Sequence, residues 1–152
     1  MDCLEVIKEY YKPEDYEEIE KYYSPQICEE YKKYYDPENP MLRNHYTTLN
    51  GKNEGIFTMY YMNGKLAKMC KYTNGELNGA YSTYYSHGST NQKCSFINNQ
   101  RQGLYVSYHS NGKPFNICNY IDGKLDGENK KYDMHGNLVM INYYNNGVKL
   151  EE

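Results

Sequence analysis

The sequence predicts a mainly β fold with a helical N-terminal cap, in which 24-residue β-hairpin repeats build one elongated, single-layer antiparallel sheet. The first observation behind this prediction is a fixed period. The phrase Gly-Lys-Leu-Asp-Gly at residues 123–127 matches Gly-Glu-Leu-Asn-Gly at residues 75–79, and looser copies occupy residues 51–55 and 99–103. A constant period of roughly 20 to 50 residues is typical of repeat architectures. The second observation is that residues 1–40 follow a different pattern, which has the spacing of helices.

Four columns of matching residues keep the 24-residue period through four consecutive copies. Two columns are glycine and two are aromatic: Gly55, Gly79, Gly103 and Gly127; Gly64, Gly88, Gly112 and Gly136; Tyr60, Tyr84, Tyr108 and Tyr132; Tyr72, Phe96, Tyr120 and Tyr144. Each copy is therefore expected to form one structural unit that stacks on the units before and after it.

The N-terminal segment carries a shorter repeat, in which a Tyr-Tyr-x-Pro phrase recurs every 12 residues. Between these phrases, apolar side chains recur in steps of three and four, which places them on one stripe of a helix. Proline ends one helix and is accepted at the start of the next. The pattern predicts three short helices, at residues 2–11, 14–23 and 26–35.

Helices of about ten residues do not persist alone in water. We therefore expect the three helices to pack on the first unit of the sheet and to cover its edge strand. That edge is predicted at residues 41–50, which align with the second half of a repeat. The chain thus divides into a helical segment at residues 1–40 and a repeat sheet at residues 41–152. The sheet comprises the partial repeat at residues 41–50, four full repeats from residue 51 and a C-terminal tail.

Each full repeat is predicted to contain two strands joined by a turn such as Asn63-Gly64, because Asn-Gly is a strong hairpin signal. Asn or His before the glycine tolerates positive φ, so His87 and His135 are interpreted as turn residues rather than functional ones. A Gly-x-x-x-Gly link joins one unit to the next. The predicted strands span residues 56–62, 66–73, 80–86, 90–97, 104–110, 114–121, 128–134 and 138–145.

The glycine at the head of each first strand needs a separate explanation, because glycine weakens a strand. We expect a ring from the Tyr60 or the Tyr72 column to lie over this glycine, so that a side chain there would clash.

Composition narrows the class of protein. The chain has 21 tyrosines, three phenylalanines and no tryptophan, which suits a thin sheet because tyrosine packs its ring and keeps its hydroxyl in water. The net charge of −3 does not favour a nucleic-acid partner, although residues 1–40 hold 12 acidic and 5 basic side chains and residues 41–152 hold 8 and 12. With no signal-peptide pattern and five cysteines without close pairing, we expect a cytoplasmic protein with reduced thiols.

Glycine-anchored, tyrosine-rich hairpins at a period of 24 residues resemble the MORN repeat over about residues 41–150. The phrases at residues 122–127 and 132–138 are similar to the variant form of that repeat, which occurs in proteins described as bacterial antitoxins and in proteins of large DNA viruses. The resemblance implies an elongated, twisted sheet that serves as a binding surface or scaffold, and some members of the family have been linked to phospholipids. The absence of tryptophan and the N-terminal segment depart from the family pattern.

We find no motif of a phosphate-binding loop, a metalloprotease or a nucleophilic hydrolase, so we expect no enzymatic activity, no catalytic residue and no cofactor. Cys70, Cys94 and Cys118 share one column of the second strands. Equivalent positions of successive hairpins lie two strands apart, about 9–10 Å, which is too far for a disulfide or a shared zinc ion. We expect free, half-buried thiols that bind no metal.

Tyr60, Tyr84, Tyr108 and Tyr132 are the candidate binding residues, because this column is expected to line one face of the sheet at a spacing of about 10 Å. In that role the column would line a solvent-facing groove that takes an extended partner, whereas in the alternative it forms the core under the helices or stacks on glycine. Both interpretations stay open, because a single-layer sheet cannot cover both of its faces. The leading hypothesis is a non-enzymatic module that binds another protein, or serves as a scaffold, through this tyrosine-lined face.

A second hypothesis comes from another class: a peripheral module that contacts anionic phospholipid weakly at a membrane surface through Lys65, Lys68 and Lys71. A net charge of +4 over residues 41–152 is small for this role. A homo-oligomer, in which the partner is a second copy of the chain, is a further alternative that the sequence leaves open.

Overall fold

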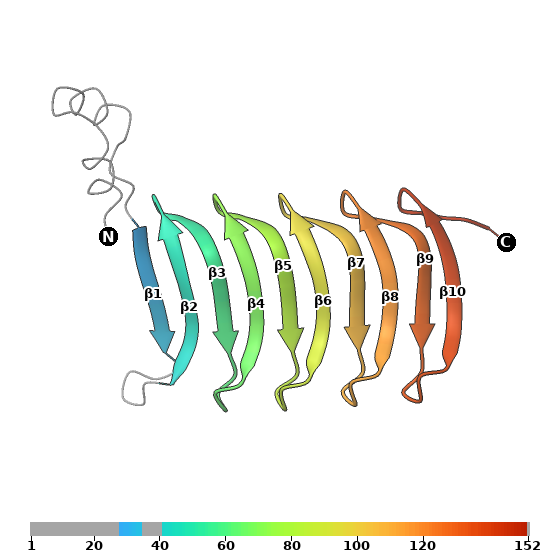
Figure 1. Ribbon diagram of the computed structural model, residues 1–152, viewed down its shortest axis with the longest axis horizontal. Helices are drawn as coiled ribbons and strands as arrows, with labels where there is room; N and C mark the ends of the chain where they lie inside the picture. Colours follow the sequence, from blue (N-terminus) through green and yellow to red (C-terminus); the bar gives the residue numbers. More distant parts are fainter. Residues whose placement is uncertain (1–27, 35–40, 152) are drawn as a thin grey trace, which may run out of the picture.

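The computed structural model describes residues 28–34 and 41–151, which form one antiparallel sheet of eleven strands (Figure 1). The strands lie in chain order, each paired with the next, and β1 and β11 stand at the two ends of an open sheet. The bounds are β1 Cys28–Tyr34, β2 Leu42–Leu49, β3 Lys52–Tyr60, β4 Leu66–Thr73, β5 Glu76–Tyr84, β6 Thr90–Ile97, β7 Gln100–Tyr108, β8 Pro114–Ile121, β9 Lys124–Tyr132, β10 Leu138–Asn145 and β11 Val148–Lys149.

The predicted sheet of hairpin repeats is confirmed, and the second strand of every repeat has the predicted bounds. Strands β4, β6, β8 and β10 span residues 66–73, 90–97, 114–121 and 138–145. The first strands were predicted too late in the chain, because β3, β5, β7 and β9 begin four residues earlier and end two residues earlier than expected. The Gly-x-x-x-Gly phrase does join one unit to the next, as a tight turn followed by the start of a strand.

The tight turn is Asn74-Gly75 and its equivalents, not Asn63-Gly64. Asn74 and Gly75 have φ of 52° and 86°, and two consecutive positive φ values give the turn whose twist matches paired strands. At the other end of the hairpin only Gly64 has a positive φ, and the loop is closed by a bond of 2.8 Å from the Tyr61 N–H to the Lys65 carbonyl. Both phrases contain Asn-Gly, so the dipeptide alone did not distinguish them.

The glycine inside each first strand marks a bulge. Across β4 and β5, Cys70 pairs with Tyr81 and Tyr72 pairs with Leu77. The chain therefore advances two residues along β4 but four residues along β5 between these two pairs. Gly79 lies within this bulge with φ of 115°, a value that side chains rarely accept. An added Cβ at the equivalent Gly103 would have no atom within 4 Å. The predicted clash with a ring is therefore wrong there: the backbone conformation is what requires glycine.

The third predicted helix, at residues 26–35, is wrong over residues 28–34. These residues form β1, which pairs antiparallel with β2 along its whole length. The edge of β2 presents unpaired backbone groups, and an extended segment pairs them directly, whereas a helix leaves them unpaired. Local helical spacing was overridden by this pairing. The other two predicted helices, at residues 2–11 and 14–23, lie outside the described residues.

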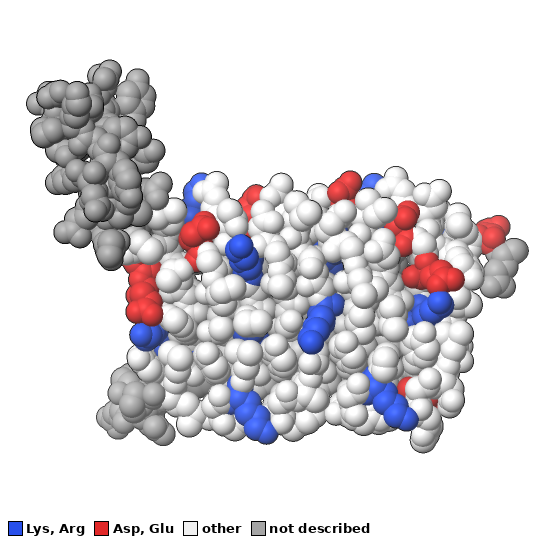
Figure 2. Space-filling view, in the orientation of Figure 1, with Lys and Arg blue, Asp and Glu red and all other residues white. Residues whose placement is uncertain are grey.

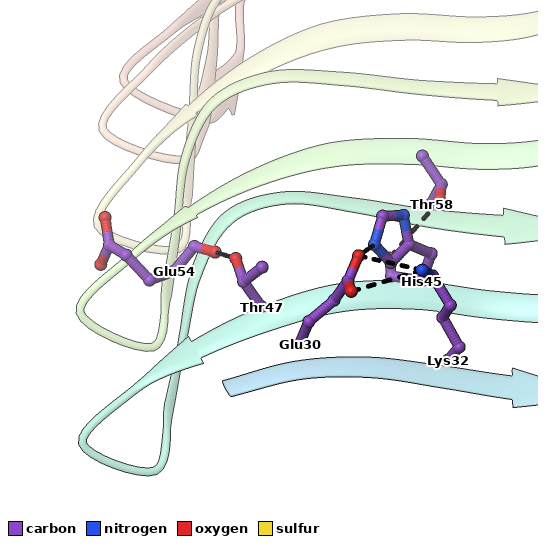
Figure 3. A network of polar contacts seen from close by, with 6 residues as sticks. All are labelled: Glu30, Lys32, His45, Thr47, Glu54 and Thr58. Atoms are coloured by element: carbon purple, nitrogen blue, oxygen red, sulfur yellow. Dashed lines mark hydrogen bonds and ion pairs between the residues drawn. The ribbon is translucent and has the colours of Figure 1, made fainter. Parts of the chain in front are cut away.

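Polar contacts fasten β1 to the sheet (Figure 3). A carboxylate oxygen of Glu30 on β1 lies 2.6 Å from Nε2 of His45 on β2, and Lys32 contacts the same carboxylate at 3.3 Å. The hydrogen bond with His45, followed by the bond and charge of Lys32, holds the pKa of Glu30 below its usual range. Beside this pair, the Thr58 hydroxyl donates to the His45 carbonyl, which connects β2 to β3.

Hydrogen bonds between neighbouring turns tie one repeat to the next along both long edges of the sheet. At one edge, the Gly75 N–H donates to the Asn53 carbonyl at 2.8 Å and the Asn74 N–H donates to the Glu54 carboxylate at 2.7 Å. At the other edge, the Tyr61 hydroxyl donates to the Tyr84 carbonyl at 2.7 Å. Such bonds recur in later repeats and hold the hairpins at a constant spacing.

In the fourth repeat, the position equivalent to Tyr61 is Asp133, which hydrogen-bonds inside its own turn rather than to a neighbouring one. Tyr85 repeats the contact of Tyr61, and Nε2 of His109 lies 2.9 Å from the next carbonyl in that column. At the equivalent position, Asp133 instead accepts bonds of 2.8 Å from the N–H groups of His135 and Asn137. Hydrogen bonds from Asn137 keep the pKa of Asp133 low. Within the described residues no repeat follows the fourth one, and Asp133 hydrogen-bonds within its own turn.

Candidate binding surfaces of the sheet

The two faces of the sheet differ in kind. Side chains alternate between faces along a strand, and the cross-strand partners Phe57, Cys70 and Tyr81 show which positions share a face. We call the face that carries the buried cysteines the ladder face, defined by the rings of Tyr31, Tyr46, Phe57, Tyr72, Tyr81, Phe96, Tyr105 and Tyr120. The other is the aliphatic face, defined by Ile56, Ile97, Leu104 and Ile121.

Rings on neighbouring strands contact one another in a row along the ladder face. Measured between ring centroids, the contacts are Tyr31–Tyr46 at 5.0 Å, Tyr46–Phe57 at 5.6 Å, Phe57–Tyr72 at 6.2 Å, Tyr81–Phe96 at 5.3 Å and Tyr105–Tyr120 at 6.0 Å. The first two pairs stack with interplanar angles of 8° and 29°, and the others are tilted or edge-on. Each such pair stabilises the sheet by about 1 kcal/mol beyond its burial.

Two cations lie over these rings. Nζ of Lys68 is 5.5 Å from the centroid of Phe57 and 5.0 Å from that of Tyr81, so it bridges rings of two successive repeats. The guanidinium carbon of Arg101 lies 5.2 Å and 5.3 Å from the next two tyrosine rings of the ladder, in β7 and β8. Such contacts contribute about 1 kcal/mol where the cation is partly desolvated.

The cysteine column lies under the ladder. Cys70, Cys94 and Cys118 are free thiols with exposed fractions of 1%, 8% and 2%. Burial raises the pKa of all three thiols. It outweighs the opposing effects of Lys68 on Cys70, of Arg101 on Cys94 and of the hydrogen bond with Tyr120 on Cys118. A raised pKa and lack of access make a thiol inert, so the column serves packing rather than chemistry.

This placement gives a labelling prediction. With the native protein at pH 8, iodoacetamide should modify the exposed Cys28 and leave Cys70, Cys94 and Cys118 unmodified, whereas all four should react in 6 M guanidinium chloride. Peptide mass spectrometry reads each site separately. Rapid native labelling of the column would contradict its burial. That the column binds no zinc stays a prediction, which metal analysis of the purified protein with and without chelator would test.

The tyrosine column predicted as a binding site lies at the lower end of the first strands in Figure 1. Tyr60, Tyr84, Tyr108 and Tyr132 are the last residues of β3, β5, β7 and β9, and all four are half-buried. Alternation along the strand puts each of them on the aliphatic face. The structure thus aligns the four tyrosines in a row, one to each hairpin, and does not gather them into a pocket.

The aliphatic face leaves large apolar side chains open. The exposed fractions of Ile56, Ile97, Leu104 and Ile121 are 54%, 52%, 61% and 45%. A shallow groove of about 430 Å³ is lined by Leu104 and Ile117 together with the charged residues Asp126, Glu128 and Lys130. Exposed apolar side chains among polar ones are typical of surfaces that contact other proteins.

The three lysines of the phospholipid hypothesis do not form one surface. Nζ of Lys65 donates to the His87 carbonyl at 2.6 Å in a neighbouring turn. Lys68 lies over the rings of the ladder face, whereas Lys71, three residues later in β4, lies on the aliphatic face. Figure 2 shows one broad side of the molecule, where basic and acidic side chains are scattered and neither sign gathers into a patch.

Sequence reasoning missed the ladder. Phe57, Tyr81 and Tyr105 keep the 24-residue period, but the fourth member of the column is Asn129, so the column is incomplete where the others are not. The signal was present in three copies of the repeat. Its partner column, which begins with Tyr72, was identified, and each of its rings pairs with the bulge glycine of the preceding strand, as Tyr72 does with Gly55.

Among residues 28–34 and 41–151, no three His, Cys, Asp or Glu side chains converge as metal ligands. The same residues include no helix with the length and apolar character needed to cross a membrane. A comparison with models of known protein families found no match, and a comparison with curated proteins found no significant match. The two faces of the sheet are therefore the candidate binding surfaces of the described residues.

Proposed function

We propose that this chain is a non-enzymatic, MORN-like repeat protein that binds another protein, as a partner or scaffold, through its aliphatic face and the adjoining tyrosines. The proposed site comprises the exposed aliphatic residues together with Tyr60, Tyr84, Tyr108 and Tyr132. One observation supports it most strongly: the described residues form a single layer, and Ile56 and Leu104, which occupy the same position in two repeats, stay 54% and 61% exposed. A partner laid across the strands would contact both.

The phospholipid hypothesis has less support. A membrane-surface site needs several cations on one side of the molecule, each worth about 1 kcal/mol near anionic lipid. The lysines at positions 68 and 71 point to opposite faces, and on the aliphatic face Nζ of Lys130 lies 2.5 Å from a carboxylate oxygen of Glu128, which neutralises it. We place the protein in the cytoplasm, where the buried thiols stay reduced.

The proposal predicts the effect of one charge on the aliphatic face. The Leu104→Glu variant should lose most of the partner that the wild-type chain captures from its native cells, because a carboxylate would be desolvated at the centre of the contact. The folded protein should tolerate the change, since Leu104 is 61% exposed. Quantitative affinity capture with mass spectrometry measures the loss.

Met62→Glu is the matched control. Met62 is 70% exposed in a turn outside both faces. The Met62→Glu variant therefore introduces the same charge at an equally exposed apolar position. The control should retain the captured partner. Equal loss from both variants, or no loss from Leu104→Glu, would count against the aliphatic face. Co-sedimentation with anionic vesicles that fades with salt would favour the phospholipid hypothesis instead.

A further inference from the structure

We propose that the ladder face is a second binding site, which takes an extended acidic segment of a partner protein and holds its carboxylates at Lys68 and Arg101. This inference goes beyond the proposed function, because it concerns the other face and a different chemistry. It depends on the charges of that face, on the unpartnered polar atoms between its rings, and on the orientation of the rings.

The charges of the ladder face have one sign over most of the sheet. From β2 to β10, strand alternation places Lys68, Arg101 and Lys131 on this face and places no Asp or Glu there. Within the described residues, neither Lys68 nor Arg101 forms an ion pair with a carboxylate. Both lie about 5 Å from the centroids of aromatic rings, and Arg101 also hydrogen-bonds to Tyr120 and Cys94. Two cations without a carboxylate, on a partly desolvated surface, favour an anionic ligand.

Buried polar atoms of this face point to a ligand with hydrogen-bond donors as well. Within the described residues, Nε of Arg101 and the amide oxygens of Asn116 and Asn129 are buried without a hydrogen-bond partner. Asn129 is only 8% exposed. These atoms are covered by neighbouring side chains, which a ligand would have to displace. An extended peptide that does so supplies both missing functions, because its backbone N–H groups donate to the amide oxygens while its carboxylates accept from the guanidinium. Phosphates of a nucleic acid offer no such donors.

The orientation of the rings also argues against bases as the ligand. Single-stranded nucleic acid binds to aromatic faces that are open for stacking. Here the faces of Tyr31, Tyr46 and Phe57 are turned toward one another, and Lys68 covers the rings of Phe57 and Tyr81. The rings of β1 to β3 therefore present their edges to a ligand, and ring edges suit carboxylates better than bases.

The spacing of the two cations sets the length of the segment. Lys68 lies in β4 and Arg101 in β7, three strands apart, and each is near the start of its strand. Because β4 and β7 run in opposite directions, the two cations lie toward opposite edges of the sheet. Their separation is on the order of 20 Å, which an extended peptide spans with about six residues. A segment with acidic residues at alternate positions would therefore offer a carboxylate to each cation.

The test measures binding of a labelled model peptide to the full chain. The probe is fluorescein-labelled (Glu-Ser)6, followed by fluorescence polarisation at low salt. We expect the double variant Lys68→Gln/Arg101→Gln to bind it at least about tenfold more weakly, since each lost charge-assisted contact is worth about tenfold. The matched control, Lys71→Gln/Lys93→Gln, removes the same charge from the aliphatic face and should bind like the wild type.

Two further measurements keep the test decisive. The charge-preserving variant Lys68→Arg/Arg101→Lys should retain binding if charge is the cause, and thermal unfolding verifies that each variant is folded. The proposal is overturned if (Gln-Ser)6 binds as tightly, if the control variant weakens equally, or if an oligothymidylate of equal charge binds more tightly. A further variant neutralises the eight acidic residues within positions 1–27. If the peptide binds only to this variant, the ladder face is assigned to the chain's own N-terminal residues, and the proposal is overturned.

Failure here is distinguishable from failure of the proposed function. The acidic peptide reports on Lys68 and Arg101, whereas partner capture reports on Leu104 of the aliphatic face. A chain that captures its partner normally but ignores the peptide would refute only the second site.

Discussion

The Cys70→Lys variant is expected to lose roughly 3 kcal/mol or more of its free energy of unfolding, a large part of the stability of a small domain. Cys70 is the most completely buried side chain of the sheet, with an exposed fraction of 1%. A lysine there would bury an ammonium group close to Lys68 and would also be too large for the space under the rings. Urea denaturation followed by circular dichroism measures the loss.

The pH dependence of this variant has a definite sign. Burial and the neighbouring cation should lower the pKa of the introduced lysine in the folded state below about 10.4, its value in the unfolded chain. The unfolded state then binds more protons, so the stability of Cys70→Lys should rise between pH 7 and pH 10. Cys28→Lys, at an exposed position of β1, should differ little from the wild type. Equal losses from both variants would show that the ladder does not cover Cys70.

The Gly79→Val variant should cost about 2–4 kcal/mol, because a β-branched residue is strained at positive φ. Gly79 has φ of 115°, and an added Cβ would lie 3.2 Å from Cδ of the Lys71 side chain, which would have to move. The adjacent Ala80→Val change is the control, since Ala80 is an exposed strand residue at which valine is favourable. Thermal or urea unfolding compares the two variants, and similar stabilities would contradict the bulge at Gly79.

Much of the fold follows from the period alone. Four copies of a 24-residue unit with aligned glycines and aromatic residues predicted the hairpins, and strands such as β4 and β8 have the predicted bounds. The bounds of the first strands were wrong because Asn-Gly occurs at both ends of the hairpin. Which pair forms the two-residue turn depends on cross-strand pairing, and that information is not local.

The N-terminal strand could not be predicted from local spacing. The sequence of β1, from Cys28 to Tyr34, carries four charges in seven residues and suits a helix as well as an edge strand. Pairing with β2 and stacking of Tyr31 on Tyr46 at 5.0 Å decide the matter, and both are tertiary contacts. Local preference is a weak guide wherever such contacts are available.

The candidate site was predicted only in part. The column that includes Tyr60 and Tyr84 was recognised from its period, but the face on which it lies depends on the strand bounds, and those were shifted. The exposed Ile56 and Leu104 occur in two of four repeats, so they stood out only once their exposure was known. Lys68 and Lys71 seemed to belong to one basic patch until their positions on opposite faces separated them.

Site-specific photo-crosslinking in the native cells tests the central claim most directly. The photoreactive amino acid benzoylphenylalanine would replace Ile56, Leu104 or, as the control, Met62. Ile56 and Leu104 lie four strands apart, about 19 Å, on the aliphatic face. The account predicts that both face positions crosslink to the same protein and that position 62 does not. No crosslink from positions 56 and 104, or the same products from all three, would contradict it.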